Sequence, residues 1–192
     1  MVGNKIAIIM VGAPGSGKGT QGELLAKNTG FKKYVMSDLI RKDIKPGSEL
    51  FDKMKKGLLL TNDDVFKVFR DQFKGEKKVI IDGIPRTLDQ AYWLYGYLVE
   101  NGYTIEVIYL KCDEKKLLKR ILKRAEEQGR SDDNKEIFKH RLEEFDRARD
   151  VILEVYSKEI VQINGDKTIE EISRNILDKL NNKLDLKFKV KK

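Results

Sequence analysis

The stretch GAPGSGKGTQ, residues 12–21, constrains the fold more than any other part of this 192-residue chain. It lies between the apolar run KIAIIMV (5–11) and a helical pattern over 18–28, so a glycine loop is expected between a strand and a helix. The spacing from Gly12 to Lys18 matches the phosphate-binding loop motif in the context that the motif requires. Backbone N–H groups of such a loop converge on phosphate oxygens, and the helix N-terminus and Lys18 add positive charge. The loop predicts binding of a nucleoside triphosphate.

Apolar runs alternate with helical patterns along the rest of the chain. Strands are expected at 5–11, 77–82, 104–110 and 159–163, with a shorter candidate at 33–36. Helices are expected at 18–28, 37–44, 61–73, 88–100, 114–127, 134–157 and 168–181, with Ser37 and Thr61 as N-caps of the second and third. This alternation predicts an α/β fold of the P-loop NTPase class, a five-stranded parallel sheet with helices on both faces.

Composition narrows the environment and the partners. The formal charge is +8, but the tail 183–192 holds five Lys and one Asp and supplies half of that excess, so a nucleic-acid-binding surface is not favoured. A single cysteine, Cys112, fits a reducing cytosol, and no apolar run is long enough to span a membrane. We therefore expect a cytoplasmic protein without a membrane association. The tail alternates apolar and polar residues and could form an edge strand or a frayed end; we expect a frayed end.

A second polar segment follows the expected strand 77–82. In DGIPRTLDQ (82–90), Asp82, Gly83 and Arg86 should lie at the carboxyl edge of the sheet, where α/β proteins bind ligands. Gly19 stands where the general motif has a magnesium-binding Ser or Thr, so Asp82 is a candidate magnesium ligand together with phosphates and water.

Arginines recur at other expected loop edges and could surround a transferring phosphate. They are Arg41, Arg120, Arg124, Arg130 and Arg141. Any one of them could be an ordinary surface charge, but guanidinium groups acting together neutralise phosphoryl oxygens effectively.

At this point the sequence resembles the adenylate kinases and related nucleoside monophosphate kinases. The resemblance runs from residue 5 to about 180. Its segments are GAPGSGKGTQ, SDLIR (37–41), KKGLLLTNDDV (55–65), DGIPRTLDQA (82–91), KRILKRAEEQGRSDDNKEIFKHRLEEF (119–145) and INGDKTIEEI (163–172). It implies phosphoryl transfer between ATP and AMP, with Mg²⁺ as cofactor and a monomeric enzyme.

The resemblance also implies roles for individual residues. ATP would be held by Gly15, Ser16, Gly17, Lys18, Gly19, Thr20, Arg120, Arg124 and Lys167. The catalytic charges would be Lys18, Arg86, Arg124, Arg130 and Arg141. The acceptor would contact Met36, Arg41, Leu58, Leu60, Gly83, Arg86, Gln90, Arg130 and Arg141. Asp82, with Asp38, would hold Mg²⁺ through water.

The same resemblance divides the chain into parts. A single kinase domain would cover 1–182, with a helical monophosphate-binding insert at about 37–73 and a short lid at about 125–134, followed by the tail. Only five residues separate Arg124 from Arg130, which leaves no room for the larger metal-binding lid of some members.

Departures from the family pattern keep alternatives open. Met36 and Ser37 stand where adenylate kinases usually have Thr-Gly, which weakens the case for AMP, whereas Thr87 and Gln90 favour AMP. A kinase for UMP, CMP or another monophosphate is the first alternative. The second, from a different class, is a nucleotide-binding regulator or RNA-associated protein without efficient transfer.

Overall fold

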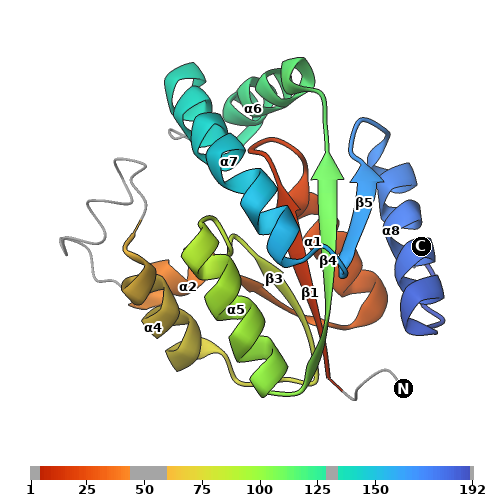
Figure 1. Cartoon of the computed structure of the whole chain (residues 1–192). Helices are drawn as coiled ribbons and strands as arrows, with labels where there is room; N and C mark the ends of the chain where they lie inside the picture. Colours follow the sequence, from red (N-terminus) through yellow and green to blue (C-terminus); the bar gives the residue numbers. More distant parts are fainter. Residues whose placement is uncertain (1–4, 44–59, 129–133, 191–192) are drawn as a thin grey trace.

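A computed structural model describes residues 5–43, 60–128 and 134–190, and its centre is a five-stranded parallel sheet (Figure 1). The strand order is β2-β3-β1-β4-β5. The strands are β1 (Lys5–Gly12), β2 (Lys32–Val35), β3 (Lys78–Asp82), β4 (Tyr103–Lys111) and β5 (Ile160–Asn164). The predicted α/β class and all five expected strands are confirmed, including the short β2.

The central strand β1 lies between β3 and β4. Its register pairs Met10 with Asp82 of β3 and Gly12 with Leu110 of β4. Seven of its eight residues are buried, as expected for a strand covered on both faces. Because the strands are parallel, the loop after Gly12 and the carboxylate of Asp82 emerge at the same edge of the sheet.

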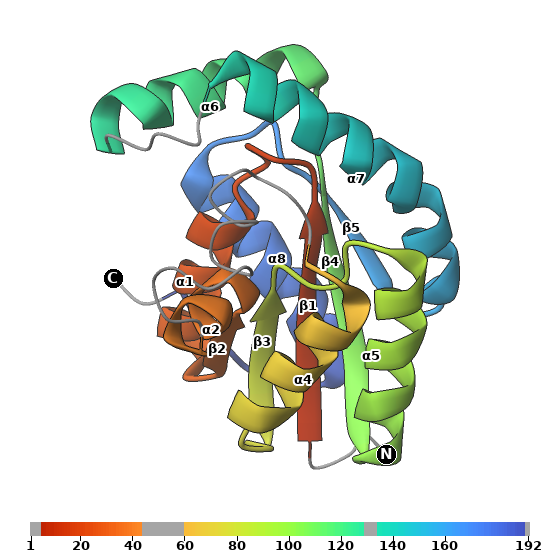
Figure 2. The same ribbon diagram turned by 90° about the vertical axis from the view of Figure 1, so that its left-hand side faces the viewer.

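Helices cover both faces of the sheet (Figure 2). One face carries α1 (Lys18–Thr29) and α8 (Ile169–Leu184); the other carries α4 (Asn62–Gln72), α5 (Leu88–Glu100) and α7 (Lys135–Val155). Two further helices, α2 (Met36–Asp43) and α6 (Glu114–Gln128), lie toward the carboxyl edge. The helix positions agree with the predicted ranges, and α8 runs three residues further than expected.

Aromatic rings join α4 to α5. The ring of Trp93 stacks on Phe66 of α4 at 4.3 Å and on Tyr97 at 5.2 Å between centroids. Phe69 meets the same indole edge-on at 5.8 Å. Trp93 is the single tryptophan of the chain, and its ring contacts link the two helices.

The predicted helix caps fare differently. Thr61 caps α4 as expected, because its hydroxyl accepts a hydrogen bond from the Asp64 N–H at 3.3 Å. Ser37 does not cap α2, since the helix already begins at Met36. A serine one residue inside a helix looks the same in sequence as a serine at its cap.

The expectation of a frayed tail is wrong for the described residues up to 190, and they do not form an edge strand either. Phe188 packs edge-on against Phe31 at 5.5 Å, and its backbone N–H and C=O both bond to the Asn181 side chain of α8. Asp185 takes a left-handed conformation at the end of α8 and turns the chain back along the helix. Two apolar side chains of the segment, Leu186 and Phe188, pack against the core.

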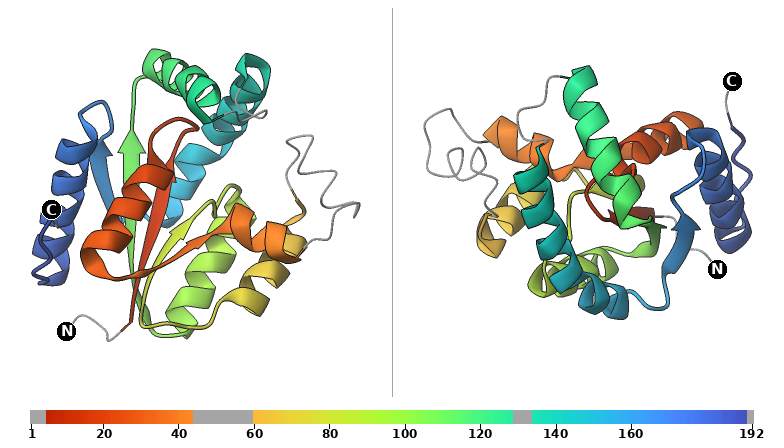
Figure 3. Two further views of the ribbon diagram at one scale, coloured as in Figure 1. Left: turned by 180° about the vertical axis from the view of Figure 1, so that it is seen from behind. Right: turned by 90° about the horizontal axis from the view of Figure 1, so that it is seen from above.

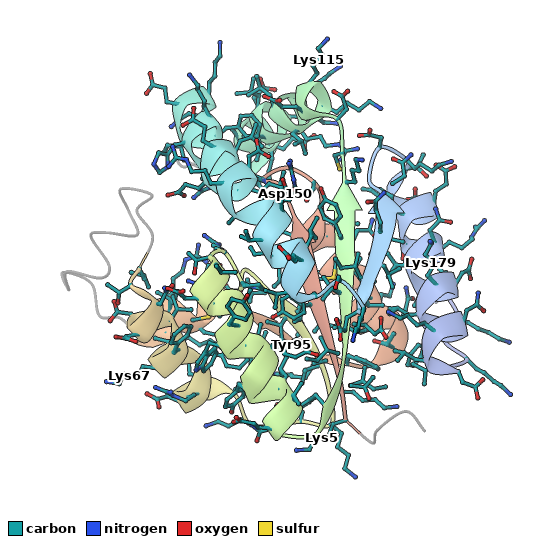
Figure 4. The ribbon with its side chains drawn as sticks, viewed as in Figure 1. Lys5, Lys67, Tyr95, Lys115, Asp150 and Lys179 are labelled. Carbon is teal, nitrogen blue, oxygen red and sulfur yellow. The ribbon has the colours of Figure 1, made fainter. Side chains whose placement is uncertain are left out.

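An ion pair ties the end of α8 to the interior of the sheet. Lys183 Nζ lies 2.6 Å from Glu106 Oε2, and the Glu106 side chain is only 5% exposed. Lys183 also donates to the backbone oxygens of Lys158 and Glu159. Other lysines, such as Lys115 on α6 and Lys179 on α8, point away from the fold (Figure 4). Within the described ranges, no helix combines the length and apolarity that crossing a membrane requires.

Candidate active site

The glycine loop connects β1 to α1 with its backbone in conformations that suit an anion. Gly17, the N-cap of α1, has φ 94°, and within the described residues no side chain caps this helix end. The first N–H groups of α1 are therefore available to a ligand. Gly15 has φ 81°, and a Cβ there would lie 2.8 Å from the backbone oxygen of Leu117 in α6. Only glycine fits at this close approach of the loop to α6.

Lys18 lies partly buried beside this loop. Its Nζ donates to the backbone oxygens of Gly12 and Ala13. Burial lowers the pKa of Lys18 to about 8; the Asp82 carboxylate opposes that shift, and the Arg86 charge reinforces it. Binding of an anion next to such a lysine stabilises its charged form and raises its pKa again.

Three arginines from different elements converge electrostatically on the same region. Arg86 follows β3, Arg124 lies on α6 and Arg141 on α7. The charge of Arg124 contributes to the lowered pKa of Lys18, and the charge of Arg141 contributes to the lowered pKa of Arg86. Seen from above, α6 crosses over the loop between β1 and α1, and α7 runs beside it (Figure 3). The structure thus brings these three predicted catalytic cations to one place.

Arg86 is oriented by its own turn. Its Nε donates to the Gly83 oxygen at 2.9 Å. The residue as a whole keeps solvent contact, yet protein atoms crowd its guanidinium; this desolvation, followed by the charge of Arg141, lowers the pKa of Arg86. A phosphate group between the two guanidiniums would remove their repulsion.

Asp82 supplies the negative charge on this edge. The residue is 7% exposed and ends β3 next to the β1 loop. In the described part of the chain, no group of three or more His, Cys, Asp or Glu could hold a metal by itself. One carboxylate beside a phosphate site is the donor set that Mg²⁺ takes when phosphates and water complete its shell. The site therefore fits magnesium bound together with a nucleotide.

A second cluster lies next to Gly83, on the predicted acceptor side. Gly83 has φ 90°, and a Cβ there would lie 3.3 Å from Cβ of Met36, which is 3% exposed. Leu60 is also buried, at 8%. Arg41 and Asp38 are both largely exposed and form an ion pair at 2.8 Å. Asp38, predicted to hold magnesium with Asp82, is thus paired with Arg41 here.

Gln90 is the predicted base-reading residue, and it is 2% exposed at the start of α5. Its Oε1 accepts from the Arg86 backbone N–H at 2.8 Å, and its Nε2 donates to Asn62 Oδ1 at 3.1 Å. Asn62 was not among the predicted site residues. Its sequence TNDD indicates only a helix start, and nothing local links it to a residue 28 positions later.

The other predicted ATP contacts lie at the carboxyl ends of β4 and β5. Arg120 of α6 donates to the Gly165 oxygen at 2.9 Å, two residues before Lys167. A Cβ at Gly165 would lie 2.3 Å from Sγ of Cys112, so glycine is required there too. Sequence reasoning missed Gly165, whose signal is a lone glycine after a strand. Cys112 is half-buried, and burial raises the pKa of its thiol.

The remaining predicted contacts differ in their exposure or lie outside the described residues. Ser16 is buried, whereas Gly19 and Thr20 are exposed at the start of α1. Leu58 and Arg130 lie outside the described residues.

The matching family model and the relatives described here point to the same family. The model of the family described as adenylate kinase matches residues 10–161. The adenylate kinase of Bacteroides fragilis is 38% identical over 179 residues, covering 88% of this chain and 95% of that protein. That of Parabacteroides distasonis is 38% identical over 185 residues, covering 91% and 97%. The adenylate kinase of Thermus thermophilus is 36% identical over 177 residues, covering 88% and 94%.

Proposed function

Because the chain belongs to the adenylate kinase family, we propose that it transfers a phosphoryl group reversibly from ATP to AMP, giving two ADP. The observation that carries this proposal is the convergence of Lys18, Arg86, Arg124 and Arg141 beside an uncapped helix N-terminus. A protein that only sensed a nucleotide would not need cations on both sides of the transferring phosphate. A regulator or RNA-associated protein without transfer is therefore not favoured.

The donor side would hold ATP by its phosphates. The backbone from Gly15 to Thr20 and the Lys18 ammonium would contact the phosphates. Arg120, which donates to the Gly165 oxygen, and Lys167 would border the base. The chemistry needs little covalent help from the protein, because in-line transfer depends on holding two nucleotides in position and neutralising charge. We propose that the phosphoryl group passes directly between the nucleotides, without a covalent intermediate on the protein.

The transition state would be stabilised by the guanidinium groups. Arg86, Arg124, Arg141 and, by resemblance, Arg130 would surround the transferring group, where preorganised charges act strongly once bound nucleotides exclude water. Desolvation and, after it, the charge of Arg141 lower the pKa of Arg86. Negative charge gathering between Arg86 and Arg141 would relieve the repulsion between them.

The acceptor side would take AMP. Arg41 and Arg86 would grip its phosphate, and Gln90 would read the base beside Met36, Gly83, Leu58 and Leu60. Binding of AMP would require Arg41 to exchange its ion pair with Asp38 for one with the phosphate.

Mg²⁺ would be held through water by Asp82 together with Asp38, and when bound it would neutralise part of the phosphate charge. We further propose that the insert at about 37–73 and the lid at about 125–134 close over the substrates. The active unit would be a cytoplasmic monomer.

A coupled assay that offers AMP, CMP, UMP, GMP and dAMP with ATP and Mg²⁺ tests the proposal. AMP should be the preferred acceptor. Turnover mainly with CMP or UMP would replace AMP by a pyrimidine monophosphate, and ATP binding without turnover of any acceptor would overturn transfer itself.

A further inference from the structure

The side chain of Gln90 is held at both ends, and the second anchor is a residue that none of the expected contacts includes. Asn62, the first residue of α4, accepts from Gln90 Nε2 and from Thr87 Oγ1 at 3.1 Å each through its Oδ1. Its Nδ2 donates to Asp89 Oδ2 at 2.9 Å. We propose that Asn62 is a positioning residue that fixes the orientation of the Gln90 amide and thereby the selectivity for the acceptor base; this rests on the proposed function of Gln90.

The polarity of this network is fixed at both ends. The Arg86 backbone N–H can only donate, so it faces the oxygen of the Gln90 amide. The Asp89 carboxylate can only accept, so it faces the nitrogen of the Asn62 amide and turns the Asn62 oxygen toward Gln90. Both anchors therefore select the same one of the two amide orientations.

A flip of the Gln90 amide would break both bonds and create two unfavourable contacts. Its nitrogen would face the Arg86 N–H, and its oxygen would face Asn62 Oδ1. Asn62 cannot flip in compensation without turning its own oxygen toward Asp89. Since Gln90 is 2% exposed, water has little access to repair such mismatches.

The fixed amide still has one N–H and one oxygen lone pair to offer a ligand. Together they match the edge of adenine, which presents an amino donor and a ring-nitrogen acceptor side by side. Hypoxanthine presents the reverse pair, a carbonyl acceptor and a ring N–H donor. An amide free to flip would serve both bases, whereas an amide held by Asn62 and Arg86 favours the 6-amino purine.

The position of Asn62 adds a second consequence. It is the first residue of α4, which lies within the proposed monophosphate-binding insert, while Thr87, Asp89 and Gln90 stand at the start of α5. The two helix starts are thus joined by the same hydrogen bonds that orient the base-reading group, and Asn62 itself is partly buried.

The test measures kcat/KM for AMP and for IMP, which differ only at this edge of the base. In N62A, only the Arg86 bond orients Gln90, so the preference for AMP over IMP should fall about tenfold, the equivalent of one well-placed hydrogen bond. The KM for ATP should stay unchanged. In N62D/D89N the network is rebuilt with the donor and acceptor roles exchanged between positions 62 and 89, so the wild-type preference should return.

T61A is the matched control. Thr61 is the neighbouring residue and caps the same helix, so its loss weakens α4 without touching Gln90. T61A should lower the thermal midpoint and leave the AMP-to-IMP ratio as in the wild type. A ratio unchanged in N62A, or changed equally in T61A, overturns the inference while the kinase assignment stands. A wild-type protein that does not phosphorylate AMP overturns the proposed function and the inference with it.

Discussion

At the scale of single residues, the most informative group is Lys18, because its surroundings disfavour its charge until a phosphate binds. Burial and the charges of Arg86 and Arg124 outweigh the attraction of Asp82 and lower its pKa to about 8. The ordinary lysine value is 10.5, so the shift affects a pH range that is readily measured.

ATP binding should therefore take up a proton above pH 8. At pH 8.5 about three quarters of free Lys18 is neutral, and bound phosphates favour the cation, so up to about three quarters of a proton should be taken up per ATP. ATP affinity should fall as the pH rises above about 8. Calorimetry in buffers of different ionisation enthalpy measures the uptake. K18R, which stays charged, should show none; equal uptake in K18R would assign the proton to another group.

Removing the charge altogether should abolish most of the activity. K18M should fold as the wild type does but lose about 10²- to 10³-fold in kcat, the usual cost of deleting a preorganised charge at a reacting oxygen. Circular dichroism and the coupled assay measure the two properties. Wild-type turnover in K18M would show that Lys18 has no catalytic role.

At the scale of elements, the apolar runs predicted the strands well, because a parallel sheet covered on both faces leaves few polar positions. The glycine loop and Asp82 were predicted to share an edge, and the register of β1 with β3 confirms this. The hydrogen bonds of Asn62 could not be predicted, since they depend on rotamers of residues 25 to 28 positions apart. The prediction of a frayed tail was also wrong. The charge of the tail suggested that it is solvated, but its two apolar side chains pack against the core.

The docked tail should stabilise α8 without affecting catalysis. F188A removes the edge contact with Phe31 and should lower the free energy of unfolding by about 1–2 kcal/mol. K189A, one residue on and exposed, is the control and should change little. Urea unfolding compares them. Equal stability of F188A and the wild type would mean that the segment contributes nothing in solution.

At the scale of the whole molecule, the Glu106–Lys183 pair joins the centre of the sheet to the C-terminal helix. Burial raises the pKa of Glu106, and the hydrogen bond from Lys183 only partly opposes that shift. An acid whose pKa is raised in the folded state binds more protons there, so this group makes stability fall as the pH rises above its unfolded value near 4.5.

K183M should leave the buried carboxylate uncompensated and cost about 2–4 kcal/mol at pH 7, with part of that loss regained as the pH falls toward 5. The double variant E106L/K183M, with no charge left to bury, should recover most of the loss. Urea unfolding at both pH values measures this. A K183M loss that does not depend on pH would show that Glu106 is not its cause.

The stack of Trp93 on Phe66 gives the protein an intrinsic optical probe. As the chain has one tryptophan, all of its indole fluorescence comes from the joint between α4 and α5. Any displacement of α4 during turnover changes the environment of that fluorophore alone. Stopped-flow emission of the unlabelled enzyme therefore follows the motion of this helix, with no dye attached and no residue replaced.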